Sequence, residues 1–136
     1  MQINIIYWSG TGNTEAMANF IKEGAEAAGA AVAVKNVADA TAADIECDIL
    51  CFGCSSMGDE VLEESEFEPY MESIEGSMSG KKVALFGSYG WGDGEWMRDW
   101  DVRMKNAGAI LVFESLIVNE MPKGDECKEF GKAIAG

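Results

Sequence analysis

Residues 2–15 read QINIIYWSGTGNTE, and this stretch decides the fold because its pattern changes from strand to helix within a few positions. The apolar, β-prone start predicts a strand over 2–8, and the residues after the loop predict a helix over 13–29. The helix prediction rests on apolar residues at helical spacing, namely Met17, Phe20, Ile21, Ala25 and Ala28. Gly29 ends this helix. Strand, glycine-containing loop and helix together form the first half of a βαβ unit.

The same alternation continues to the end of the chain. Further strands are predicted at 32–37, 48–54, 81–88 and 110–118, the last interrupted by Glu114-Ser115. Further helices are predicted at 66–75, over the segment of Trp96, Met97, Trp100 and Met104 with Asp93 as N-cap, and over a last segment begun by Asp125. Five strands that alternate with helices predict a parallel sheet with helices on both faces. The 136 residues are therefore expected to form one α/β domain, 1–136, with a doubly wound open five-stranded parallel sheet.

Three unusual loops each follow a predicted strand. They cover residues 9–15, 54–60 and 88–95. In an open parallel sheet, ligands bind beyond the carboxyl ends of the strands, where the strand order reverses. If the three strands are neighbours, these loops converge on one site.

The charge balance excludes several classes of function. The chain has 24 Asp and Glu against 10 Lys and Arg, a net charge of −14, and no histidine. The absence of histidine excludes a histidine general base, a Ser-His or Cys-His nucleophile and a histidine-ligated metal. The negative charge argues against nucleic acid and an anionic membrane as partners and favours a basic protein.

The four cysteines predict reduced thiols in a cytoplasmic protein. Cys47, Cys51, Cys54 and Cys127 do not form the pattern of a disulfide framework, and no signal peptide or membrane-spanning run is evident. Cys51 and Cys54 form a C-x-x-C, but Cys51 lies within an apolar strand and not at a helix N-terminus, which disfavours a thiol oxidoreductase. The spacing matches no usual zinc or iron–sulfur pattern, so no metal site is predicted.

The first loop, Ser9-Gly10-Thr11-Gly12-Asn13-Thr14, has the properties of an anion site. Its glycines let successive N–H groups point into one concavity, and the following helix adds partial positive charge. It contains no Lys or Arg, and Glu15 stands where a dinucleotide fingerprint needs a third glycine. A Walker loop and a dinucleotide site are therefore disfavoured, and a terminal monophosphate held by neutral donors is favoured.

The other two loops carry groups suited to a planar aromatic ligand. Ser55 adds a phosphate donor, and Met57 is a polarisable group that can lie against a ring. Tyr89 and Trp91 stand between glycines, so at least one of the two rings is expected to be exposed.

The loops SGTGNT, GCSSMGDE and SYGWGDG, in this order and after these strands, closely resemble those of a short-chain bacterial flavodoxin, and the resemblance covers essentially the whole chain. It implies the flavodoxin-like strand order 2-1-3-4-5 and FMN as cofactor, bound at the switch point between the first and third strands; both are properties of that family.

The resemblance also implies a role for each loop residue. The FMN phosphate is expected to be bound by Ser9, Thr11, Gly12, Asn13, Thr14 and Ser55. Met57 is expected on the inner face of the isoalloxazine and Trp91 on the outer face, with Tyr89 as the alternative, and the Gly58 carbonyl is expected to turn toward flavin N5. Backbone groups of Asp59, Glu60, Tyr89 and Gly90 are expected at the pyrimidine edge, with Glu60 near N3. Ser88 is also expected among the cofactor-binding residues.

The function that follows is electron transfer without enzymatic turnover. The resemblance implies a low-potential one-electron carrier that binds FMN non-covalently and cycles between semiquinone and hydroquinone. The acidic residues near the flavin loops would disfavour the extra negative charge, and the cluster Asp59, Glu60, Glu63, Glu64, Glu66 and Glu68 would form a docking rim. Expected partners are redox proteins, ferredoxin-like donors or acceptors and reductases, which dock through basic patches on a monomer. The alternative is an FMN-dependent NAD(P)H oxidoreductase.

Overall fold

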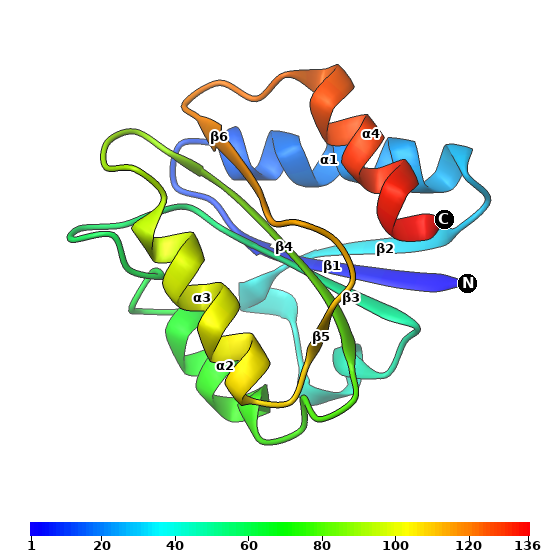
Figure 1. Ribbon diagram of the computed structural model, residues 1–136, viewed down its shortest axis with the longest axis horizontal. Helices are drawn as coiled ribbons and strands as arrows, with labels where there is room; N and C mark the ends of the chain where they lie inside the picture. The colour runs from blue at the N-terminus through cyan, green and yellow to red at the C-terminus, as the bar shows by residue number, and fades with distance from the viewer.

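The computed structural model describes residues 1–136 and places the predicted strands in one parallel sheet (Figure 1). The strand order is β2-β1-β3-β4-β5, and β6 also pairs with β4, so β5 and β6 share the outer edge of the sheet. The strands are β1 (Gln2–Trp8), β2 (Ala31–Asn36), β3 (Ile49–Cys54), β4 (Lys82–Tyr89), β5 (Ile110–Leu111) and β6 (Leu116–Asn119). The predicted order 2-1-3-4-5 is confirmed.

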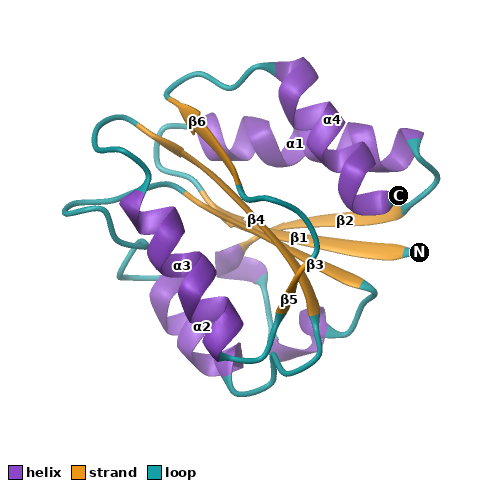
Figure 2. Ribbon diagram, viewed as in Figure 1, coloured by secondary structure: helices purple, strands orange, loops and turns teal.

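The helices cover both faces of the sheet, as predicted (Figure 2). They are α1 (Asn13–Ala27), α2 (Phe67–Glu75), α3 (Glu95–Asn106) and α4 (Gly124–Ala135), with short 3₁₀ helices η1 (Val37–Asp39) and η2 (Ala42–Ile45). Helices α1 and α4 lie together on one face, and α2 and α3 lie on the other. None of these helices is long and apolar enough to cross a membrane.

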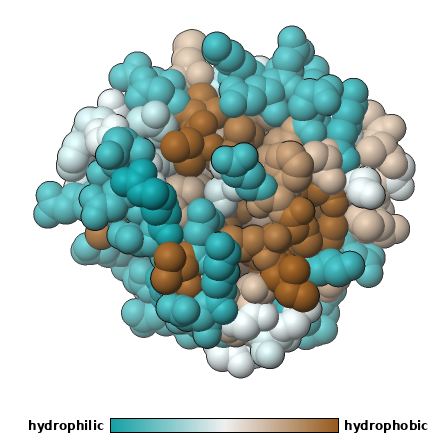
Figure 3. All heavy atoms as spheres, in the orientation of Figure 1, coloured by the Kyte–Doolittle hydropathy of each residue, from teal (hydrophilic) through white to brown (hydrophobic).

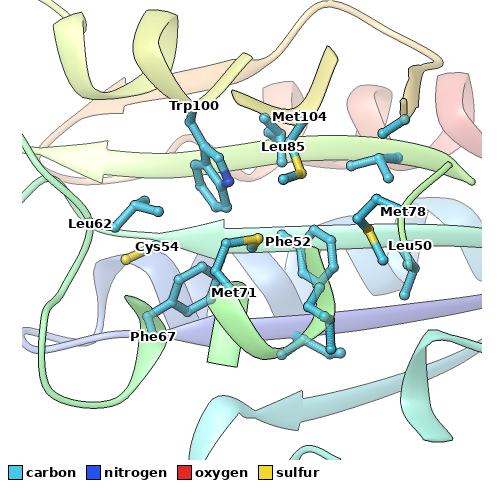
Figure 4. Close-up of a cluster of buried hydrophobic side chains, with 14 of the residues drawn as sticks. Leu50, Phe52, Cys54, Leu62, Phe67, Met71, Met78, Leu85, Trp100 and Met104 are labelled. Atoms are coloured by element: carbon cyan, nitrogen blue, oxygen red, sulfur yellow. The ribbon is translucent and has the colours of Figure 1, made fainter. Parts of the chain in front are cut away.

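Two hydrophobic cores lie on the two sides of the sheet because strand side chains alternate in direction. On β3, Leu50 and Phe52 point into the core under α2 and α3, whereas Ile49 and Cys51 point into the core under α1 and α4. Figure 4 shows the core under α2 and α3, where the Trp100 ring packs edge-on against the Phe67 ring, with ring centres 5.4 Å apart. Every residue of β3 is buried, as expected for a central parallel strand.

Helices α1 and α4 approach closely because glycines stand where they cross. A Cβ on Gly24 would lie 2.0 Å from the Lys128 carbonyl oxygen, and one on Gly131 would lie 2.2 Å from the Ile21 carbonyl oxygen. This close approach fixes α1, and with it the loop that precedes α1, relative to the sheet.

Several details differ from the prediction. Helix α1 ends at Ala27, two residues before Gly29, and Val37 lies in η1 and not in the second strand. The segment 110–118 is not one strand but divides into β5 and β6, and the break contains the Glu114-Ser115 pair that the pattern had marked. Helix α4 begins one residue before Asp125. The prediction that Asp93 caps α3 is wrong, because Gly94 is the N-cap residue and a distant carboxylate accepts the N–H groups that Asp93 was expected to bind.

Candidate functional site

A cavity of about 510 Å³ opens at the carboxyl ends of β1, β3, β4 and β6. This volume is typical of a site for a cofactor-sized ligand. The cavity is lined by Trp8, Gly10, Thr11, Asn13, Ser55, Ser56, Met57, Ser88, Tyr89, Gly90, Glu120 and Met121. The three predicted loops therefore converge on one site, at the edge of the sheet where the topology requires it.

The predicted site residues divide into two groups. Those that line the cavity are Thr11, Asn13, Ser55, Met57, Ser88, Tyr89 and Gly90. Those that do not line it are Ser9, Gly12, Thr14, Gly58, Asp59, Glu60 and Trp91. The second group surrounds or supports the cavity, and most of its members have a contact that explains their position.

Ser9 and Gly12 shape the first loop. The Gly12 N–H donates to the Ser9 hydroxyl oxygen at 3.0 Å, which closes the loop on itself. Gly12 has a φ of +98°, a left-handed conformation that side chains disfavour, and it caps α1. This turn leaves Thr11 and Asn13 facing the cavity in front of the N-terminus of α1.

Thr14 joins the three loops through its hydroxyl group. The side chain is fully buried, and its Oγ1 lies 2.7 Å from Ser55 Oγ and 3.2 Å from Ser88 Oγ. The Ser88 N–H also donates to Thr14 Oγ1 at 3.4 Å. Ser55 and Ser88 line the cavity, so Thr14 orients two polar groups of the site from behind.

The second loop is a tight turn between Met57 and Val61. The two residues exchange backbone hydrogen bonds, each of 2.9 Å. Gly58 has a φ of +49° and Glu60 a φ of +56°, so two of the three residues between them are left-handed. Met57 is 37 % exposed and lines the cavity.

Two glutamates of this loop bind the N-termini of helices. Glu60 Oε1 accepts from the backbone N–H groups of Gly94 and Glu95, at 3.1 and 3.0 Å, where α3 begins. Glu63 accepts from three backbone N–H groups where α2 begins, at 2.7 to 3.0 Å; the donors are Ser65, Glu66 and Phe67. Carboxylates stabilise a helix N-terminus because they satisfy unpaired N–H groups and its partial positive charge.

The acidic cluster is therefore partly internal. Glu60 and Glu63 are buried, and Glu68 is held by Arg103, whose guanidinium nitrogens lie 2.6 and 2.7 Å from its two oxygens. Only Asp59, Glu64 and Glu66 of the six residues remain exposed. The exposed acidic surface beside the cavity is smaller than the sequence suggested.

The two aromatic residues of the third loop have different surroundings. The Tyr89 ring packs against Trp96, with ring centres 5.5 Å apart, and Tyr89 is half-buried. Trp91 is 61 % exposed and makes no comparable ring contact. The free Trp91 ring is thus the better candidate for the outer face of a planar ligand.

Sequence reasoning missed a fourth loop. Glu120 and Met121 follow β6 and line the cavity, and the Glu120 N–H donates to the Tyr89 carbonyl oxygen at 2.7 Å. The signal was available, because these residues also follow a strand at the same edge of the sheet. Trp8, Gly10 and Ser56 line the cavity as well and stand within or beside the loops already identified.

The cysteine geometry argues against thiol chemistry. Cys51 and Cys54 belong to the two cores on opposite sides of the sheet, so they cannot act as a redox pair. Burial raises the pKa of the Cys54 thiol to about 12, which keeps it protonated at neutral pH. All four cysteines are free.

Comparison with known proteins identifies the fold and its family. The family model described as Flavodoxin matches residues 5–131. A flavodoxin of Clostridium beijerinckii is 56 % identical over 136 residues, covering 98 % of this chain and 99 % of that protein, and one of Megasphaera elsdenii is 49 % identical, covering 98 % of both. The solution structure of the two-electron reduced Megasphaera elsdenii flavodoxin superimposes with a TM-score of 0.90 at 47 % identity, covering 98 % of both chains. The chain belongs to the flavodoxin family, whose members are FMN-binding electron carriers and not enzymes.

Proposed function

We propose that the cavity at the ends of β1, β3, β4 and β6 is the FMN site through which this chain carries low-potential single electrons between redox proteins. The observation that carries the proposal is the convergence of hydroxyl and amide donors from separate loops on one cavity. FMN supplies the one-electron chemistry when it is bound, and the protein binds it and adjusts its potential.

The donor set fits a terminal monophosphate. Thr11, Asn13 and Ser55 line the cavity, and the N-terminus of α1 adds N–H groups and partial positive charge. No Lys or Arg lines the cavity. Neutral donors before a helix N-terminus suit a single terminal phosphate.

The apolar lining fits a flavin ring. Trp8, Met57 and Met121 supply polarisable surface along the cavity, and the exposed Trp91 directly follows the lining residue Gly90 in sequence. We assign Met57 to the inner face of the ring and Trp91 to the outer face. The backbone of Tyr89 and Gly90 lies at the cavity and can meet the polar edge of the ring.

Charge near the cavity supports a low potential. Glu120 lines it, and the exposed Asp59 lies in the adjoining loop, while no cation lines it. The Arg98 guanidinium pairs with Asp93 at 2.9 Å but both side chains are exposed, so this pair offsets little of the negative field. Negative charge near a group disfavours the addition of an electron to it, and the potential falls.

The test is a potentiometric titration of the FMN-loaded protein, followed by its visible spectrum. We expect two separate one-electron steps, the second at a potential well below that of free FMN. NAD(P)H alone should not reduce the bound flavin. A single two-electron step near the potential of free FMN would contradict the proposal, and rapid reduction by NAD(P)H alone would favour the oxidoreductase.

We also propose that partners dock at the cavity edge through basic patches. Glu120 lines the cavity, and the exposed Asp59 and Glu64 lie in and just after the loop that carries Met57, so all three can attract such a surface. Electron-transfer rates with a basic redox protein should fall as salt is raised, because screening weakens the attraction. The chain is expected to act as a monomer in the cytoplasm, where its four free thiols stay reduced.

A further inference from the structure

A second groove lies beside the sheet edge, away from the FMN cavity. It has a volume of about 490 Å³ and lies between the connection from β5 to β6 and helix α4. Its apolar lining includes Phe113, Leu116 and Phe130. Figure 3 shows apolar side chains gathered on the face that carries β5 and this connection.

The apolar part of the groove is open to solvent. Phe113 is 47 % exposed, and its ring stands edge-on to the buried Phe130 ring at 5.8 Å. The sheet contributes no further strand on this side, because β5 and β6 form its outer edge. An exposed aromatic side chain beside a hydrophobic groove is typical of a protein contact.

Three carboxylates surround this apolar surface. Glu114 lines the groove on one side, and Glu126 and Glu129 line it from α4; all three are exposed. No Lys or Arg lines the groove. The only ion pair of these glutamates joins Glu129 to Lys132 at 3.5 Å, and both side chains are more than half exposed, so it contributes little.

We propose that this groove is a docking surface for a segment of another protein that combines apolar residues with lysine or arginine. The apolar lining accepts aliphatic side chains and the stems of long basic residues, and the glutamates accept their charged ends. A second copy of this chain does not fit, because a net charge of −14 on each molecule opposes self-association.

The groove and the FMN cavity are separate along β6. The groove is lined by Leu116 and Ile117, at the start of this strand, and the cavity by Glu120, just after its end. A strand rises about 3.3 Å per residue, so the nearest lining residues of the two sites lie about 10 Å apart along it. A segment bound in the groove therefore leaves the cavity edge free, and this inference does not depend on the identity of the cofactor.

The experiment uses the ¹⁵N-labelled, FMN-loaded protein and a synthetic peptide of alternating lysine and leucine, six residues long with blocked ends. We expect its addition to shift the amide resonances of 113–117 and 126–133. A peptide of alternating lysine and glycine should bind at least about tenfold more weakly, because it lacks the side chains that bury apolar surface.

Matched variants separate the groove from general electrostatic attraction. Phe113→Ser should weaken binding of the lysine–leucine peptide at least about fivefold, whereas Val102→Ser, at a similarly exposed apolar residue outside the groove, should not. Glu114→Gln should weaken it more than Glu72→Gln; both glutamates are exposed and neither makes an ion pair.

Four outcomes would overturn the proposal. In the first, the amide shifts are confined to 59–66 or spread over the whole surface. In the second, the two lysine peptides bind with equal affinity. In the third, Phe113→Ser and Val102→Ser change the affinity for the lysine–leucine peptide equally. The fourth is a dimer in sedimentation that Phe113→Ser dissociates, because the occupant would then be a second copy of this chain.

Discussion

At the scale of single residues, the site depends on side chains that do not all face the ligand. Thr14 is fully buried and holds Ser55 and Ser88 through its hydroxyl, so the geometry of the cavity depends on an atom behind it. Buried hydroxyl groups are costly when they lose a partner. We therefore expect the residue to position these two groups, and its direct contact with the phosphate, which the motif predicts, stays a prediction.

Thr14→Val tests this role. The change removes one hydroxyl and leaves those of Ser55 and Ser88 without their shared partner. We expect FMN affinity to fall about tenfold, equivalent to about 1.4 kcal/mol, in a fluorescence titration of the apoprotein. Thr14→Ser keeps the hydroxyl, and its affinity for FMN should stay close to that of the wild type. If Thr14→Val binds FMN as tightly as the wild type, the Thr14 hydroxyl does not position the site.

Gly58→Thr tests the turn of the second loop. Gly58 has a φ of +49°, and a Cβ there would meet nothing within 4 Å, so the cost of a side chain is conformational and not steric crowding. A β-branched residue disfavours this conformation and restricts rotation of the peptide. The two one-electron potentials of the bound FMN should move closer together. Unchanged potentials would show that this peptide does not respond to the flavin.

At the scale of elements, the loops are held by helices. Glu60 and Glu63 stand three residues apart in one loop and bind the N-termini of α3 and α2. The loop that carries Met57 is thereby tied to the helices on one face of the sheet. On the other face, the glycine contacts between α1 and α4 fix the first loop.

Glu63→Gln gives a prediction with a defined pH dependence. Burial raises the pKa of the Glu63 carboxyl, but the hydrogen bonds from three backbone N–H groups together lower it by more. The pKa in the folded protein therefore lies below the usual 4.5. The ionised form therefore stabilises the fold above pH 4.5, and this stabilisation is lost as the pH falls through the lowered pKa.

In urea unfolding, Glu63→Gln should cost about 1 kcal/mol at pH 7, and its difference from wild type should shrink below pH 4.5. Glu64→Gln, at an exposed neighbour with no hydrogen bond to a helix, should change little at either pH. A pH-independent difference for Glu63→Gln would mean that charge is not the cause.

Gly131→Ala tests the contact between α1 and α4. The new Cβ would meet the Ile21 carbonyl oxygen at 2.2 Å, so the helices must separate. We expect a loss of about 2 kcal/mol in the free energy of unfolding, measured with urea. Gly76→Ala is the matched control, because its Cβ would meet nothing within 4 Å and its φ of −67° suits alanine. Equal stabilities of the two variants would contradict the tight crossing.

At the scale of the whole molecule, the sequence predicted the topology and the place of the site, and the misses are non-local contacts. The alternation of strands and helices and the loop motifs depend on residues that are neighbours in sequence, so they could be predicted from the sequence. The cap of α3 could not be, because Glu60 stands 34 residues before Gly94 and excludes Asp93 from that role. The fourth loop, with Glu120 and Met121, carries no motif, and the sequence analysis missed it although it follows a strand at the same edge as the others.

The acidic residues behind the net charge of −14 have different roles in the folded protein. Some carboxylates bind helix N-termini or Arg103, and among the exposed ones Glu120 lines the FMN cavity and Glu114, Glu126 and Glu129 line the groove beside β6. The acidic composition thus serves helix capping as well as the field around the site.

A comparison of FMN with riboflavin, which lacks only the phosphate, tests the site itself. We place that phosphate at Thr11, Asn13 and Ser55, before the N-terminus of α1. Titration of the apoprotein with each ligand should show FMN bound at least about 100-fold more tightly, since several charge-assisted hydrogen bonds contribute. Equal affinity for the two ligands, or no binding of FMN, would contradict the central claim.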